Sequence, residues 1–270
     1  MIDLSKAEKE KDAYREQGRK YSRLILRFNK IEYHGLENIV EDQPGIIAPN
    51  HVGSAKDILT LFNIFDTKDI QLFYAARRDM FVMDEWYGLV KKHLRKHLGI
   101  VSKLIPDKAV RRFAEETPSK LARIGTIPFD IKNGIGFRSS MRTVERYLSE
   151  YGRKVVLFQY DEEKRRADKK ALFHGANKGA AFAVNRAYQK SGLVVPVYPT
   201  AIIGSHGLMP ECICVNIGKP LEINYFYEHI AGENPIDTMT HALDVRIKDL
   251  LDELKNEKKD GKIIYPGRPR

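Results

Sequence analysis

The sequence predicts an α/β fold, with a largely parallel central sheet covered by helices on both faces and a helical extension at the N-terminus. Short apolar segments alternate with longer amphipathic ones from residue 31 onward, and this alternation is typical of parallel sheets. No stretch rich in Pro, Gly or Ser divides the chain. We therefore expect an amphipathic helix over residues 1–30, one α/β domain over 31–257 and a basic tail over 258–270.

The individual elements follow from hydrophobic spacing and turn residues. Strands are predicted where short apolar runs are bounded by turns, over residues 31–33, 44–49, 71–75, 126–131, 154–159, 194–202 and 211–218. Helices are predicted where apolar residues recur at helical spacing, over residues 58–65, 80–122 with breaks at Pro106 and Pro118, 139–151, 177–190 and 236–257.

The charge of the chain favours an anionic partner. Lys and Arg number 46 against 36 Asp and Glu, a net charge of +10 at pH 7, which attracts phospholipid, phosphorylated substrates or nucleic acid. We predict no nucleic-acid partner, because no recognition module accompanies the charge. The aromatic and basic segment 77–98 predicts a surface helix, either at an anionic membrane surface or packed on the core.

Hydropathy and cysteine usage indicate the compartment. No run approaches the ~18 apolar residues of a membrane-spanning helix, and the charged start of the chain predicts no signal peptide. We expect a cytoplasmic protein, peripheral on the inner face of a membrane. Cys212 and Cys214 alternate onto one face of a strand, where a disulfide does not readily form. With no further Cys or His beside them, we predict no metal site.

A histidine and a carboxylate lie one short loop apart where the strand at 44–49 gives way to a helix. Loops at the carboxyl ends of strands are held by the scaffold while their side chains stay accessible. His51 is therefore a candidate general base, and Asp57 a candidate for orienting it. The alternative is that Asp57 only complements the helix dipole.

This loop resembles the Asn-His-x4-Asp block of the glycerolipid acyltransferase family, which includes 1-acylglycerol-3-phosphate acyltransferase. Other segments resemble further blocks of that family in the same order, over residues 125–132, 154–158, 173–181, 194–202 and 215–221. The likeness extends from about residue 31 to 254 and implies the family's fold and its acyltransferase activity.

Two departures from the family pattern are visible. Five residues separate His51 from Asp57 where the family has four, and Val52 or Gly53 is the inserted one. Glycine can bulge a loop without strain, so the insertion can be absorbed beside the histidine. The family's Phe-Pro-Glu-Gly-Thr-Arg block is replaced by residues 158–166, which lack its Pro, Gly and Thr.

The resemblance implies a reaction and a site. A fatty acyl group would pass from acyl-CoA or acyl-carrier protein, the co-substrate, to a hydroxyl of a lysophospholipid or glycerol-phosphate-like acceptor, with no other cofactor. His51 would be the general base, and Asp57 would stabilise the imidazolium. The substrate contacts expected are Asn50, Ser54, Lys132, Arg138, Glu162, Glu163, Lys164, Arg165, Arg166 and Lys178. The alternative, favoured by the departures, is a non-catalytic protein that binds acyl-CoA or anionic membrane on the same scaffold.

Overall fold

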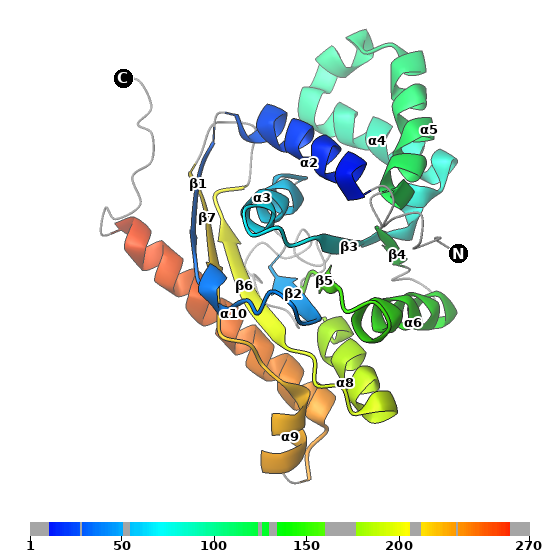
Figure 1. The fold of residues 1–270 in the computed structure, drawn as a ribbon. Coiled ribbons are helices and arrows are strands. Elements are labelled where there is room, and N and C mark those ends of the chain that lie inside the picture. The colour runs from blue at the N-terminus through cyan, green and yellow to red at the C-terminus, as the bar shows by residue number, and fades with distance from the viewer. Residues whose placement is uncertain are drawn as a thin grey trace. The chain divides into compact units, whose positions relative to one another are not determined.

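The computed structural model describes residues 11–27, 29–50, 55–123, 126–129, 134–159, 177–205, 212–230 and 232–259. The chain forms two compact units. The smaller unit comprises Met1–Tyr14 and Phe73–Thr143, and the larger unit comprises Arg15–Leu72 and Val144–Arg270. The elements of both units are labelled in Figure 1. The domain bounds at residues 30 and 257 stay predictions.

Five strands of the larger unit lie side by side in the order β1-β7-β6-β2-β5. They are β1 (Lys30–His34), β2 (Gly45–Pro49), β5 (Lys154–Val156), β6 (Val197–Ile203) and β7 (Cys212–Ile217). The pairs β1–β7, β2–β5 and β2–β6 are parallel, whereas β6–β7 is antiparallel. The antiparallel pair follows from its short connection, because a parallel neighbour requires a crossover of about a dozen residues or more. The predicted largely parallel sheet is confirmed.

The centre of this sheet is buried from solvent. Ile46, Ile47 and Ala48 of β2 are 0% exposed, as are Tyr198 and Ile202 of β6. Strands covered on both faces require continuous apolar runs instead of alternation, which explains the uninterrupted apolar segment that predicted β2.

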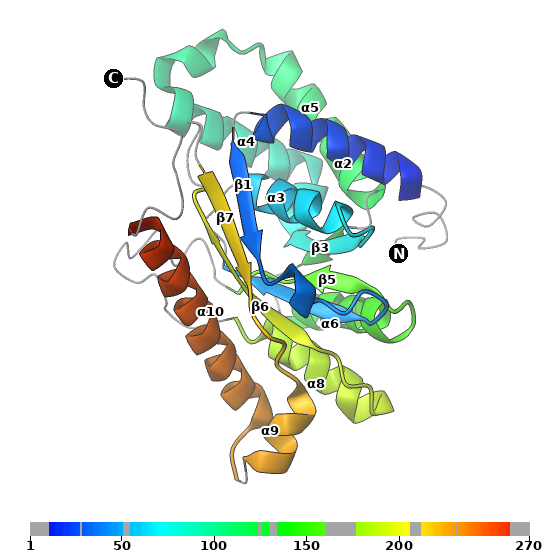
Figure 2. The same ribbon diagram turned by 60° about the vertical axis from the view of Figure 1, so that its left-hand side comes forward.

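Helices cover both faces of the sheet in the larger unit. The helices with residues in this unit are α2 (Lys11–Leu26), α3 (Ala55–Asp66), α6 (Gly134–Ser149), α8 (Gly179–Ser191), α9 (Ile223–His229) and α10 (Pro235–Lys259), with the 3-10 turn η1 (Leu36–Asn38). Figures 1 and 2 show α10 along one face of β6 and β7, with α2 and α3 on the other. Leu243, Ile247 and Leu250 of α10 are buried at helical spacing. The seven residues of α9 were not predicted, because so short a helix shows no clear period.

The smaller unit holds a parallel strand pair and a helical hairpin. Its elements are β3 (Leu72–Arg77), η2 (Arg78–Phe81), α4 (Met83–Leu98), η3 (Gly99–Leu104), α5 (Asp107–Arg123), β4 (Ile127–Phe129) and the start of α6. The helix predicted over residues 77–98 is present as α4 but begins later, because the first residues of that range end β3 and form η2. Trp86 of α4 packs on Phe113 of α5, with ring centroids 6.4 Å apart. The aromatic side of α4 therefore contacts a neighbouring helix.

The predicted helix break at Pro118 is wrong, because Pro118 lies inside α5. A proline in a helix removes one backbone hydrogen bond. Side-chain hydroxyls add bonds around it: Thr117 donates to the carbonyl of Phe113 at 2.7 Å, and Ser119 to that of Glu116 at 2.9 Å. Pro106 does separate two helices, since α5 begins directly after it.

Gly35 joins β1 to η1 in a conformation that only glycine adopts easily. Its φ is +75°, and a Cβ there would lie 1.9 Å from the carbonyl oxygen of Ile217. We expect Gly35→Ala to lower the free energy of unfolding by about 2–4 kcal/mol, from backbone strain plus the clash. Gly152→Ala is the matched control, because Gly152 also has a positive φ, +60°, but nothing within 4 Å of a Cβ. Equal losses in denaturant titrations of the two variants would contradict the expected clash.

The buried ammonium of Lys154 makes the free energy of unfolding depend on pH. Its ammonium is buried at the amino end of β5 and donates to the carbonyl oxygens of Glu41 and Gln43, each at 2.6 Å. Burial lowers the pKa of Lys154 to about 8 from 10.5, although the carboxylates of Asp42 and Glu41 oppose the change. Between those pH values the unfolded chain binds more protons than the folded protein, so this group's contribution to the free energy of unfolding rises with pH.

Below the folded pKa of Lys154 that contribution is constant. Relative to Lys154→Met, the wild-type free energy of unfolding should therefore rise by about 2–3 kcal/mol between pH 7.5 and 10.5. Urea titrations at a series of pH values measure the difference. A difference that does not change with pH would show that the ammonium is not destabilised by burial.

Candidate active site

The carboxyl ends of β2, β5 and β6 meet at one edge of the larger unit's sheet, here called the carboxyl edge. The Asn50 N–H donates to the carbonyl of Thr200 at 3.2 Å, and the Gln159 N–H donates to that of Pro49 at 3.0 Å. The Asn177 N–H, just before α8, donates to the Gln159 carbonyl at 2.6 Å. Three strands and the start of α8 are thus joined directly beside the histidine loop.

Asn50 fixes the start of that loop. Its side-chain Nδ2 donates to the carbonyl of Ile202 at 3.0 Å, and its Oδ1 accepts the Ile202 N–H at 2.6 Å. The side-chain amide therefore acts like one more residue of the β2–β6 ladder. An amide nitrogen carries two hydrogens, and the hydrogen bond to Ile202 uses one of them, so within the described residues the other can serve the predicted substrate contact.

Asp57 lies on the other side of the loop, in the first turn of α3, and it is 0% exposed. A carboxylate is favoured by the dipole at a helix N-terminus. Lys56 beside it is 8% exposed, and its ammonium lies 3.5 Å from Oδ1 of Asn29. In the sequence His51 therefore lies between Asn50, whose side chain is hydrogen bonded to β6, and Asp57, which is buried.

Several predicted site residues lie outside the described residues, and their roles stay predictions. They are His51, Ser54, Lys132, Glu162, Glu163, Lys164, Arg165 and Arg166. The distance between the His51 imidazole and the Asp57 carboxylate therefore also lies outside the described residues. This distance would distinguish a catalytic pair from an incidental one.

The two remaining basic candidates have different surroundings. Lys178 precedes α8, and its ammonium pairs with Asp237 of α10 at 2.5 Å. The N–H of Gly179 behind it is capped by the Asn177 side chain at 3.3 Å. A phosphate at this helix end would have to compete with Asp237 for Lys178. Arg138 is exposed on α6, in the smaller unit.

The structure adds one residue that the sequence did not indicate, Gln159. It is 0% exposed, and its side-chain nitrogen donates to the carbonyl of Leu157 at 2.9 Å. Within the described part of the chain, its side-chain oxygen has no hydrogen-bond partner. A buried acceptor at the carboxyl edge can receive a hydroxyl or amide hydrogen of a ligand. A glutamine in an apolar strand carries no signal of this, because only strand pairing brings it beside β2.

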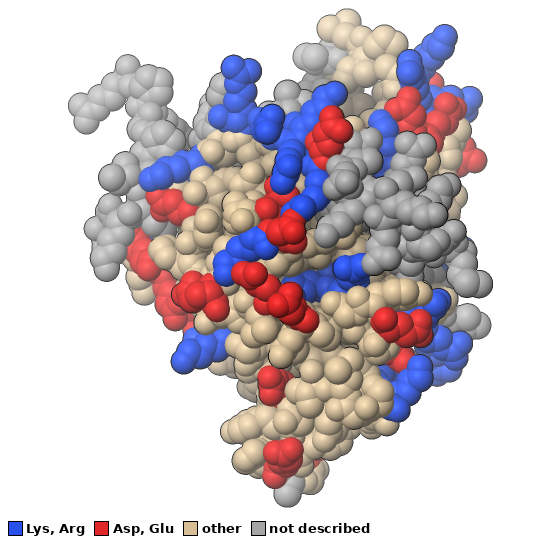
Figure 3. All heavy atoms as spheres, in the orientation of Figure 1, with Lys and Arg blue, Asp and Glu red and all other residues tan. Residues whose placement is uncertain are grey.

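Surface charge does not gather into a patch of one sign on the face shown in Figure 3. In Figure 3 acidic and basic side chains are interspersed over the described surface in view. Several are paired, as Arg19 is with Asp66 at 2.7 Å and Lys68 with Glu41 at 3.0 Å. In the smaller unit a hollow of about 350 Å³ is lined by Lys91, Arg95 and Lys103, among others, and by none of the predicted site residues. Among the described residues, no helix combines the length and the apolar character needed to cross a membrane.

Comparison with known proteins bears on the fold. No protein-family model matches this chain, and no curated protein does either. The crystal structure of the 1-acyl-sn-glycerophosphate (LPA) acyltransferase PlsC from Thermotoga maritima is similar, with a TM-score of 0.53 and 17% sequence identity. The match covers 94% of this chain and 84% of that one. The likeness is one of fold, and it confirms the fold class predicted from the ordered sequence blocks.

Proposed function

We propose that this chain is an acyltransferase that moves a fatty acyl group from an acyl thioester to a hydroxyl of a lysophospholipid or glycerol-phosphate-like acceptor. The observation that carries the proposal is the junction at the carboxyl edge. There Asn50 is bound to Ile202 and Asp57 is buried in the first turn of α3, on either side of His51. A fold shared with an LPA acyltransferase supports the same chemistry.

In the proposed reaction, the His51 imidazole removes the proton of the acceptor hydroxyl as its oxygen attacks the thioester carbonyl. The tetrahedral intermediate then collapses, the carbon–sulfur bond breaks, and the imidazolium returns the proton to the leaving thiolate. The products are an ester and a free thiol, and no acyl-enzyme forms. Asp57 stabilises the imidazolium, and its burial strengthens that interaction because little water screens it.

The basic run Lys164, Arg165 and Arg166 is proposed to bind phosphates of the donor or the acceptor, because a phosphate is bound by convergent basic donors. Lys132 is a separate candidate for a phosphate contact. The residues that flank the basic run support its role. Gln159 and Asn177 are hydrogen bonded to each other at the carboxyl edge, so the chain between them leaves and returns beside β2.

The acceptor class sets the proposed place of action. Lysophospholipids reside in membranes, and the net charge of +10 favours an anionic surface. We therefore propose a cytoplasmic protein of phospholipid biosynthesis that works peripherally at the inner face of a membrane.

A thiol-release assay tests the proposal. The purified full chain is given acyl-CoA or acyl-carrier protein with lysophosphatidate, other lysophospholipids, glycerol phosphate or an amine. Release of thiol that requires a hydroxyl acceptor is the expected result. Binding of acyl-CoA or anionic vesicles without thiol release from either donor would refute the enzyme and favour the non-catalytic binder.

A further inference from the structure

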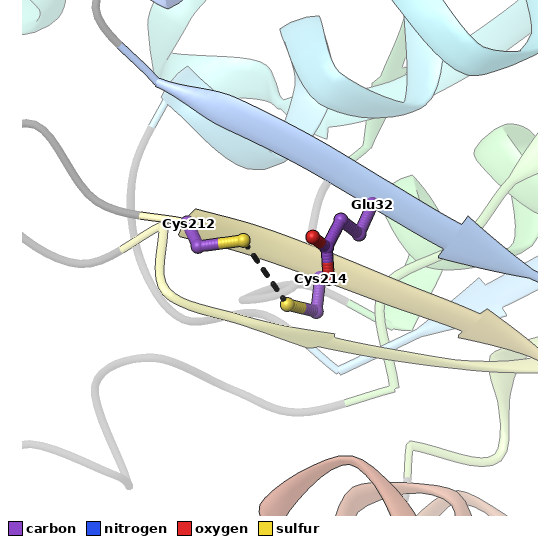
Figure 4. Close-up of side chains that lie close together, drawn as sticks. All are labelled: Glu32, Cys212 and Cys214. Carbon is purple, nitrogen blue, oxygen red and sulfur yellow. Dashed lines mark hydrogen bonds between the residues drawn. The ribbon is translucent and has the colours of Figure 1, made fainter. Parts of the chain in front are cut away.

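Two cysteines and a carboxylate converge at the edge of the larger unit's sheet that is formed by β1 and β7. This edge lies away from β2. Figure 4 shows Cys212 and Cys214 on β7 and Glu32 on the neighbouring β1. The two sulfur atoms are 3.7 Å apart, and the ligand atoms of all three residues lie within 4.8 Å of one another. Both cysteines are 0% exposed, whereas the Glu32 side chain is 22% exposed. The group therefore has a buried sulfur side and a carboxylate side that reaches solvent.

Strand geometry produces this convergence. Residues two apart on a strand point to the same face, so Cys212 and Cys214 lie side by side. The parallel register of β1 with β7 sets Glu32 directly opposite Cys214. The third group thus comes from a strand distant in sequence.

The spacing of the two cysteines suits a pair of metal ligands better than a disulfide. Both are free thiols, and residues two apart on an extended strand have Cα atoms ~6.5–7 Å apart, at the upper limit for a disulfide. A tetrahedral ion with metal–sulfur bonds of ~2.3 Å holds its sulfur ligands ~3.8 Å apart. The two thiols share a hydrogen bond at 3.7 Å, and this separation matches the one that such an ion requires, so the sulfur atoms need not move apart or together to bind it.

We propose that Cys212, Cys214 and Glu32 bind a thiophilic divalent metal ion of the zinc class. The three residues supply three ligand atoms, and a water molecule on the exposed side of Glu32 completes a tetrahedron. This site is independent of the proposed acyl transfer.

Neighbouring charges suit such an ion. Two thiolates and a carboxylate carry three negative charges against two positive ones, and Lys30 lies 2.5 Å from one carboxylate oxygen of Glu32. Lys30 offsets the remaining charge, while the second oxygen of Glu32 serves the metal. Burial raises the pKa of both thiols, so each must release its proton to solvent as its sulfur–metal bond forms.

Other titratable groups face the same cluster. His34 of β1 lies 3.7 Å from Glu257 of α10, and Lys258 of α10 also acts on Cys212.

The test is a titration of the reduced, metal-free full chain with Co²⁺. We expect one equivalent to produce a thiolate-to-cobalt charge-transfer band in the near ultraviolet, and Zn²⁺ to displace it. Cys212→Ser and Cys214→Ser should each lose the band, and Glu32→Gln should weaken binding at least about tenfold. Glu37→Gln is the matched control, since Glu37 is an exposed carboxylate on η1, outside the cluster; it should bind like the wild type.

A second measurement on the wild-type chain guards against variants that fail to fold. After dialysis of the native protein against Zn²⁺, one equivalent of the metal per chain should be retained. No charge-transfer band from the folded wild type, or no Zn²⁺ retained after dialysis, would overturn the metal site.

Discussion

Replacing His51 with Ala is expected to lower acyl-dependent thiol release by at least about a thousandfold, because the acceptor hydroxyl loses its general base. The fold should persist, since the loop's anchors, the Asn50 amide and the buried Asp57 carboxylate, belong to other residues. Initial rates at saturating acyl-CoA and acceptor, with the free energy of unfolding measured in parallel, separate the two effects.

The matched control for this experiment is His241→Ala. His241 is an exposed histidine on α10, in the same unit. It should retain wild-type rates. A fully active His51→Ala protein would refute the proposed mechanism, and would do so whether or not the metal site exists.

Replacing Asn50 with Ala is expected to cost both stability and activity. The variant loses two hydrogen bonds to the Ile202 backbone and leaves buried polar groups without partners, a loss of about 2–3 kcal/mol in the free energy of unfolding. The rate should also fall about a hundredfold, because a loop displaced by ~1 Å misplaces the general base.

Asn38→Ala separates the loss of stability from the loss of position. The Asn38 side chain also donates to a backbone carbonyl, that of Ile217, at 2.7 Å, but at η1. We expect Asn38→Ala to lower stability without lowering the rate at a temperature where it stays folded. Asn50→Asp should be intermediate, because a carboxylate still accepts the Ile202 N–H but no longer donates to its carbonyl. Equal rates for Asn50→Ala and Asn38→Ala would show that Asn50 does not position the site.

Local pattern explains which parts of the fold were predictable. Continuous apolar runs identified β2 and β6, because strands buried on both faces tolerate few polar residues. Helical spacing identified α3, α8 and α10. Pro118 was misjudged, because a proline predicts a break from local sterics alone, whereas packing on α4 and hydroxyl hydrogen bonds keep α5 continuous.

The candidate active site was also predictable from the sequence only in part. The sequence indicated Asn50 and Asp57 through the spacing of one loop and the order of the blocks after it. It did not indicate that the Asn50 amide pairs with β6, or that Gln159 and Asn177 meet beside it. These contacts depend on the order and register of strands, which residue spacing does not encode.

By itself, then, the sequence determined the α/β class, the position of nearly every strand and helix, and the loop at which acyl transfer is proposed. The fold class and the elements depend on neighbouring residues, through hydrophobic spacing and turn chemistry, whereas the loop's proposed role depends on the resemblance of the ordered blocks to the glycerolipid acyltransferases. Only the tertiary structure decided that β7 runs antiparallel to β6, that Asn50 anchors the histidine loop, and that Glu32 joins the two cysteines. The physical reason is that strand pairing joins residues far apart in the chain. A local sequence pattern carries no information about such contacts.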